Sequence, residues 1–292
     1  MKGVRRVAAM RALVREARRR GKSVGFVPTM GALHEGHLSL VRRARRAHDR
    51  VVVSVFVNPL QFGPTEDLRS YPRDERRDAA LCREAGCDWF FRPSVDEMYP
   101  EGFQTSVTPG PLAGRWEGAV RPGHFSGVLT VVLKLLEAVE PDTLYLGQKD
   151  AQQAAVVGAM MRDFALPSRL SVAPIVREPG GLAMSSRNVY LSPEERARAA
   201  GFPRALAAAA ALARRGVRDA RRLEAAAKRV LRLETKPDAI DYVAVVDPAT
   251  LEPIRRVAAR GLLLGAIRVG RTRLIDNRIL IPASGPRGER RS

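Results

Sequence analysis

The sequence predicts an α/β protein in which a doubly wound, parallel-sheet domain is followed by a smaller α+β domain. Three observations predict this fold class. Short β-branched runs alternate with helical patterns over the first half of the chain. The pattern changes after Val176, where a polar stretch precedes two helical segments and three β segments. The 292 residues, 45% of them hydrophobic, are enough to bury one or two cores.

The elements of the first half follow from periodicity. Val7, Met10, Val14 and Ala17 recur at helical spacing and predict a first helix. The other predicted elements are, in order, strand 23–27, helix 36–48, strand 51–57, helix 73–85, strand 88–91, helix 124–139, strand 142–146, helix 151–164 and strand 169–175. This alternation is typical of a Rossmann-like, nucleotide-binding sheet.

The second half opens with a polar, glycine-bearing stretch over 177–188. The predicted elements that follow are helices 193–215 and 219–233 and strands 240–246, 262–269 and 271–281. Residues 282–292 contain almost no apolar side chains, so we expect a disordered tail there. The predicted domains are therefore 1–176 and 177–281, the second acting as a lid over the first.

The net charge of +19 first suggests a nucleic-acid partner. Arginine and alanine recur through almost every predicted helix, however, which indicates a coding bias rather than a binding stripe. A positive field also suits small phosphate-bearing substrates. We therefore expect no nucleic-acid partner. We also expect no membrane span, because no apolar run approaches the roughly 18–20 residues that a bilayer requires.

Cys82 and Cys87 are the only cysteines, and their spacing is not that of a C-x-x-C motif. We expect both to be reduced and partly buried. The N-terminal 22 residues are rich in arginine but lack the serine-rich stretch of a transit peptide, so a structural helix is the better interpretation. The expected location is the cytoplasm.

The first chemical motif is PTMGALHEGH at residues 28–37, between a predicted strand and a predicted helix. Its glycines allow a tight turn, and the N-terminus of the helix offers unpaired N–H groups to a phosphate. His34 and His37 would share one helix face and could donate to the same polyphosphate. A zinc pair or two capping histidines are the alternatives, although no further ligand at zinc spacing lies nearby. An H-x-G-H sequence after a strand is typical of nucleotidyl transfer.

The second motif, NPLQFG at residues 58–63, follows the next predicted strand. In an open parallel sheet the ligand lies beyond the carboxyl ends of the strands, so Asn58 and Gln61 could bind a small polar substrate. An ordinary Asn-Pro turn is the simpler explanation of this motif taken alone.

The third motif is GQKDAQQ at residues 147–153, where a predicted strand again leaves through glycine into a helix. Lys149 offers a mobile positive charge to phosphate, and Asp150 suits either a ribose contact or a helix cap. Gln153 would lie one turn into the helix and face the same crevice.

The fourth motif, MSSRN at residues 184–188, follows Gly180 and Gly181 between the two predicted domains. Its hydroxyl groups and guanidinium suit a mobile phosphate clamp. Combined with H-x-G-H, it resembles the HIGH and KMSKS elements of the nucleotidylyltransferase-like superfamily.

Taken together, the four motifs resemble the pantothenate synthetase (pantoate–β-alanine ligase) family. The resemblance runs from about residue 24 to residue 277 and includes TRLIDN at 272–277. It implies ATP-dependent condensation of (R)-pantoate with β-alanine to pantothenate, AMP and pyrophosphate, through a pantoyl adenylate, in the synthesis of a coenzyme A precursor. It also implies a cytoplasmic homodimer and Mg²⁺ on the phosphates of ATP.

The resemblance also assigns site residues. His37, as proton donor, together with His34 and Lys149, would be catalytic. Gln61 would contact pantoate and β-alanine, and Gln153 would contact pantoate. No metal ligand is assigned. The implied ATP-binding residues are Met30, Gly31, Ala32, Leu33, His34, Glu35, Gly36, His37, Gly147, Gln148, Lys149, Asp150, Val176, Met184, Ser185, Ser186 and Arg187.

Two other classes of protein stay open at this point. A nucleotidylyltransferase or tRNA-charging relative would share H-x-G-H, but 292 residues leave little room for a tRNA-binding module. A nucleic-acid-binding protein would explain the charge and leave the motifs unexplained. AMP release that depends on both β-alanine and pantoate would distinguish the three classes.

Overall fold

The structure is a computed structural model that describes residues 1–64 and 66–283. The chain divides into two compact units, Met1–Val176 and Arg177–Ser292, and each is described by itself. Most of the predicted tail, residues 284–292, lies outside the described residues. Among the described residues, no helix has both the length and the apolar character needed to cross a bilayer.

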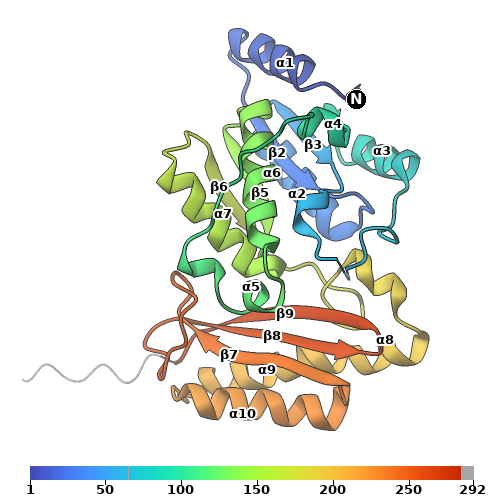
Figure 1. Cartoon of the computed structure of the whole chain (residues 1–292). Coiled ribbons are helices and arrows are strands. Elements are labelled where there is room, and N and C mark those ends of the chain that lie inside the picture. Colours follow the sequence, from blue (N-terminus) through green and yellow to red (C-terminus); the bar gives the residue numbers. More distant parts are fainter. Residues whose placement is uncertain (65, 284–292) are drawn as a thin grey trace, which may run out of the picture. The chain divides into compact units, whose positions relative to one another are not determined.

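The first unit contains a six-stranded, fully parallel sheet in the order β1-β4-β3-β2-β5-β6 (Figure 1). The chain winds outward from β2 to β3 and β4, then restarts beside β2 with β5 and β6. This reversal confirms the predicted doubly wound fold, and in such folds the ligand-binding crevice is expected at the reversal, here between the carboxyl ends of β2 and β5. The strands are β1 (Lys2–Val4), β2 (Val24–Thr29), β3 (Arg50–Val55), β4 (Trp89–Phe91), β5 (Thr143–Gly147) and β6 (Arg169–Ala173).

Helices cover both faces of this sheet because successive strand residues point to opposite sides. On β2, Phe26 packs in a cluster with α1 and α6, whereas the next residue, Val27, packs in a second cluster with α2. The helices of this unit are α1 (Val7–Arg19), α2 (Glu35–Ala47), α3 (Glu75–Glu84), α4 (Val95–Met98), α5 (Glu117–Val120), α6 (His124–Val139) and α7 (Ala151–Asp163).

Helix α6 has the bounds that the sequence predicted, and most of its residues are buried. It passes close to the short 3-10 turn η1 (Pro59–Gln61). A Cβ added at Gly127 would lie 2.2 Å from the backbone oxygen of Leu60, so only glycine permits this approach. Helix α6 therefore packs directly against the second motif and supports it.

The second unit is an antiparallel sheet of β7 (Ala239–Val246), β8 (Gly261–Val269) and β9 (Thr272–Leu280) with helices packed against it. Its helices are α8 (Pro193–Ala199), α9 (Gly201–Arg214) and α10 (Ala220–Val230). Phe202 and Leu206 of α9 are fully buried in the core of this unit. Gly265 on β8 leaves room for the Phe202 ring, which would lie 2.8 Å from an added Cβ.

Two predicted helices differ from the structure, and some short elements, such as β1, were not predicted. The helix predicted over 193–215 is two helices, because Pro203 has no N–H for the carbonyl of Ala199 and its ring would clash there. The helix predicted over 219–233 ends at Val230 and passes into a wider π turn, Leu231–Thr235. The three-residue strand β1, which pairs with β4, was not predicted because it is too short to show a period.

The two cysteines are free thiols, and both are buried, more deeply than the sequence predicted. Cys87 donates to the backbone oxygen of Trp89 at 3.2 Å. The hydrogen bond with Cys87 and burial together raise the pKa of the Cys82 thiol.

Candidate active site

The first motif is a tight loop that leaves β2 at the crevice and enters α2. Two consecutive residues have left-handed backbone, Gly31 with φ of 90° and Ala32 with φ of 49°. A Cβ at Gly31 would lie 3.0 Å from both Val55 and the carboxylate of Asp78, so glycine suits this position in shape as well as in backbone angle.

Asp78 on α3 holds this loop, a role that the sequence analysis missed. Its carboxylate accepts hydrogen bonds from the backbone N–H groups of Ala32 at 2.9 Å and Leu33 at 2.8 Å. Only 1% of the residue is exposed, and this burial raises the pKa of its carboxyl group against the opposing effect of the two N–H donors. The available signal was a lone aspartate on the apolar face of helix 73–85, one turn before Cys82.

Most N–H groups of the loop before α2 already have acceptors within the protein, which differs from the prediction of unpaired N–H groups at the start of this helix. The Gly31 N–H donates to the Thr29 hydroxyl, and Asp78 receives those of Ala32 and Leu33. In the following turn, the N–H groups of His34, Gly36 and His37 also donate within the turn. Side chains are therefore the more available donors of this loop.

His34 and His37 cap α2 and stack on each other. The Gly36 N–H donates to Nδ1 of His34 at 3.1 Å, and the His34 N–H donates to Nδ1 of His37 at 3.4 Å. The two ring centroids are 4.1 Å apart. Because both Nδ1 atoms accept, the proton of each neutral ring lies on Nε2, which becomes a donor. The predicted pair of phosphate donors and the alternative of two capping histidines thus describe the same arrangement.

The third motif lies near this pair. Desolvation, followed by the charges of His34 and Lys149, holds the pKa of His37 well below its ordinary value. His37 is therefore neutral near pH 7. Lys149 lies in a short 3-10 turn after β5, and its Nζ is 3.2 Å from Oδ1 of Asp150. The carboxyl ends of β2 and β5 thus bring together two imidazole rings whose Nδ1 atoms accept hydrogen bonds and one lysine ammonium.

Gln61 of the second motif lies against the first motif. Its Nε2 contacts the Met30 sulfur at 3.0 Å, and its Oε1 accepts from Nδ2 of Asn58 at 3.1 Å. The residue is 8% exposed. The side-chain amide is thus held in one orientation beside Met30.

Asn58 is a support for Gln61 and not a free binding group. Its Nδ2 also donates to the backbone oxygen of Gly127, while its Oδ1 accepts from the Tyr99 hydroxyl at 2.7 Å. Only 1% of Asn58 is exposed, and both polar atoms of its amide are engaged. Because Asn58 is less exposed than Gln61, which is 8% exposed, Gln61 is the better placed of the two amides for the substrate contact that the sequence suggested for both.

A second support for this turn, also missed from the sequence, comes from the start of α6. His124 Nδ1 donates to the backbone oxygen of Gln61 at 2.9 Å, because its Nε2 accepts from Arg121, also at 2.9 Å. Arg121 in turn forms two hydrogen bonds with Glu66, at 2.6 and 2.7 Å. Burial and the charge of Arg121 lower the pKa of His124 to about 4, so its neutral form persists below pH 6.

On α7, neighbouring glutamines have different environments. Gln152 is buried, donates to the backbone oxygens of Leu112 and Arg115, and accepts from the N–H of Glu117. Gln153 is half-buried, on the next position around the helix. Gln152 thus holds the 111–117 segment, and Gln153 remains the residue of α7 suited to a ligand.

The fourth motif belongs to the second unit, whereas Val176, another residue implied to bind ATP, is half-buried at the end of the first unit. Ser185 begins a 3-10 turn, η4 (Ser186–Tyr190), where its hydroxyl accepts from the Arg187 N–H at 3.3 Å. Within this unit, Asp276 forms a bidentate ion pair with Arg177 at 2.7 and 3.0 Å. Because Asp276 is buried, it fixes the segment that leads to the motif.

Comparison with known proteins agrees with this arrangement. The sequence profile of the family described as "Pantoate-beta-alanine ligase" matches residues 2–279. The chain belongs to the pantoate–β-alanine ligase family. The resemblance inferred from the four motifs is confirmed, as is the reaction that it implied: the chain is a ligase that uses ATP to condense pantoate with β-alanine.

Relatives in this family match along nearly their whole length. The pantothenate synthetase of Heliobacterium modesticaldum is 52% identical over 280 residues, covering 96% of this chain and 99% of the relative. That of Koribacter versatilis is 50% identical and covers 100% of both chains.

Solved structures of the family agree in fold. The enzyme of Thermus thermophilus has a TM-score of 0.92 at 50% identity, covering 97% of this chain and 100% of that one. The ligase of Francisella tularensis, solved in complex with beta-gamma ATP and β-alanine, has a TM-score of 0.77 at 33% identity, covering 96% of this chain and 97% of that one.

Proposed function

We propose that this ligase works in two steps at the crevice between β2 and β5. A carboxylate oxygen of (R)-pantoate attacks the α-phosphorus of ATP, the bond from that phosphorus to the bridging oxygen breaks, and pyrophosphate leaves. The amine of β-alanine then attacks the acyl carbon of the pantoyl adenylate, loses a proton, and expels AMP. Neither step needs a nucleophile from the protein.

The observation that carries this proposal is the set of side chains gathered at the crevice. His34 and His37 supply Nε2–H donors, and Lys149 supplies a cation near His37. Such groups stabilise charge that develops on phosphate oxygens. In this proposal ATP is bound by residues 30–37, 147–150, 176 and 184–187, with the fourth motif acting as a lid.

Gln61 and Gln153 are proposed to orient the small substrates. Gln61 presents a fixed amide with a donor and an acceptor, which suits first the oxygens of pantoate and later the incoming amine. Gln153 is proposed to contact pantoate from α7.

Mg²⁺, a homodimer and a cytoplasmic location complete the proposal. Among the described residues, no group of three or more His, Cys, Asp or Glu side chains is placed to hold a metal ion. An Mg²⁺ ion that is held by the phosphate oxygens of ATP and by several waters does not require such a group. The ion would neutralise charge on the leaving pyrophosphate.

Calorimetry with Gln61→Ala tests the assignment of the substrates. Pantoate is titrated into wild type and variant in the presence of a non-hydrolysable ATP analogue, with exposed Gln104→Ala as the matched control. We expect pantoate affinity to fall about tenfold or more in Gln61→Ala, for the loss of one or two buried hydrogen bonds, while affinity for the ATP analogue stays unchanged. Unaltered pantoate affinity would contradict the role given to Gln61.

Lys149→Ala tests the division between the two steps. Formation of pantoyl adenylate should slow, because the charge on phosphate loses its cation. Preformed pantoyl adenylate should still react with β-alanine at nearly the rate of wild type. The rates of both half-reactions are measured under single-turnover conditions. An equal loss in the two rates would refute this assignment.

A further inference from the structure

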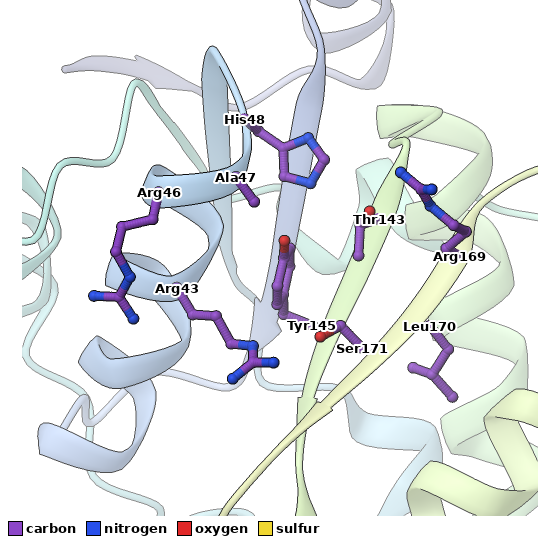
Figure 2. Close-up of a pocket in the computed structure, with 9 residues that line it drawn as sticks. All are labelled: Arg43, Arg46, Ala47, His48, Thr143, Tyr145, Arg169, Leu170 and Ser171. Carbon is purple, nitrogen blue, oxygen red and sulfur yellow. The ribbon is translucent and has the colours of Figure 1, made fainter.

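A separate hollow lies at the far end of α2 from the histidine pair. It has a volume of about 480 Å³ and is lined from α2, β5 and β6 (Figure 2). Arg43 and Arg46 come from the last turns of α2, and Arg169 is the first residue of β6. Since α2 has 13 residues, its ends are about 18 Å apart, so this hollow is distinct from the crevice.

The charges of this hollow are of one sign. Its lining residues include three arginines and no carboxylate. Within residues 1–64 and 66–283, Arg43, Arg46 and Arg169 form no ion pair. Their neighbours on α2 behave differently, because Arg42 pairs with Glu35 and Arg45 pairs with Asp88. The three guanidiniums therefore keep their hydrogen-bonding capacity for something outside the described chain.

The floor of the hollow holds polar groups that are buried. His48 is only 8% exposed, and its Nδ1 has no hydrogen-bond partner among the described residues. Its ring meets the Tyr145 ring edge-on, with centroids 5.9 Å apart, and Figure 2 shows both among the arginines. A buried polar atom without a partner costs free energy, which a bound ligand or water would recover. Thr143 and Ser171 add hydroxyl groups to the same wall.

We propose that this hollow binds a small multiply charged phosphate anion, such as pyrophosphate or the phosphates of a nucleotide. Guanidinium groups match phosphate oxygens with paired N–H donors. The carboxyl end of α2 contributes about half a negative charge, which three arginines outweigh. The volume is sufficient for several phosphoryl groups, and the three guanidiniums without an ion pair make the charged portion of the ligand the main source of affinity.

The test is a titration of inorganic pyrophosphate at a fixed ionic strength of about 0.15 M. Wild type should show two classes of site, one in the crevice and one in the hollow. In Arg43→Gln/Arg169→Gln, one class should weaken by about 100-fold, since each charge-assisted bond contributes at least tenfold. In Lys149→Ala, the other class should weaken. The Arg43→Gln/Arg169→Gln variant should keep the wild-type rate of condensation when no pyrophosphate is added.

Arg15→Gln/Arg76→Gln is the matched control, because both arginines are exposed and the variant loses the same charge. It should retain both classes. A wild type in which no class of site is weakened by Arg43→Gln/Arg169→Gln, or an equal loss in this control, would overturn the proposal. The proposal would also be overturned if a short RNA bound wild type but not Arg43→Gln/Arg169→Gln, while both proteins bound pyrophosphate equally. Separate titrations with ATP and with a trinucleotide, compared with pyrophosphate, show whether the phosphates that bind in the hollow are free or belong to a nucleotide.

Discussion

At the scale of single residues, His34 and His37 fix each other's tautomers. Each Nδ1 atom is an acceptor within the capping turn, so each Nε2 carries a proton toward the crevice. Because the pKa of His37 is well below its ordinary value, its neutral ring suits a hydrogen-bond donor better than the proton donor that the family resemblance implied.

Replacing His37 distinguishes these roles. His37→Ala should slow single-turnover formation of the adenylate by about 100-fold or more, because one donor to the reacting phosphate is lost. His37→Gln keeps a neutral N–H and should recover part of this loss. A rate in His37→Ala equal to wild type would show that the residue has no part in the first step, and no recovery in His37→Gln would favour proton transfer.

His124 should make stability depend on pH. Its pKa is lowered from 6.5 to about 4 in the folded chain, so the unfolded chain binds more protons between these values. The stability that its neutral form contributes is complete above pH 6.5 and is lost as pH falls toward 4. Between pH 7.5 and pH 5 the free energy of unfolding should fall by about 2 kcal/mol because of this group.

Urea unfolding of wild type and His124→Gln at both pH values measures this effect. The decrease in free energy of unfolding should be smaller in His124→Gln by about that amount, since all other groups are common to both proteins. An identical decrease in the two proteins would contradict the lowered pKa.

At the scale of elements, α6 and the turn η1 form one supporting layer for Gln61. The helix offers the Gly127 oxygen to Asn58 and the His124 ring to the backbone of Gln61. The turn can approach only because Gly127 has no side chain. The orientation of one substrate-binding amide therefore depends on a glycine in the middle of a helix.

Gly127→Ala should separate these elements. Its Cβ would meet the Leu60 backbone, which cannot rotate away, so we expect a loss of about 1–3 kcal/mol despite the better helix propensity of alanine. KM for pantoate should rise in parallel. Gly158→Ala on α7 is the control, because its Cβ would meet only the ends of two side chains, those of Leu170 at 3.1 Å and Arg162 at 3.7 Å. Equal stability and KM in the two variants would contradict the support described for Gln61.

At the scale of the whole molecule, periodicity predicted the sheet and the motif positions, since branched runs and helical patterns alternate in sequence. The four motifs could be located because glycine, histidine and lysine are conspicuous at strand ends. Asp78 and Tyr99 could not, because they bond to Ala32 and Asn58, which lie 46 and 41 positions away, and such pairings leave no period in the sequence. Pro203 was a signal for a break in helix 193–215, but the alanine-rich run that follows it favoured the prediction of one continuous helix.

The second unit should fold without the first. It has its own antiparallel sheet and its own apolar core, centred on Phe202, Leu206 and Leu263. A fragment of residues 177–292 is expected to unfold in one cooperative urea transition, and Phe202→Leu should lower its midpoint because a buried contact shrinks. A fragment without a cooperative transition would show that this unit depends on residues 1–176.

The buried thiols make this chain a convenient background for labelling. Cys82 and Cys87 are both buried, and the raised pKa of Cys82 further suppresses its thiolate. Maleimide reagents should therefore leave the native protein unmodified. A cysteine introduced at Val189, which is 67% exposed in η4, would take up a single fluorophore next to the fourth motif. Its emission during turnover would report directly whether that segment changes its surroundings when ATP binds.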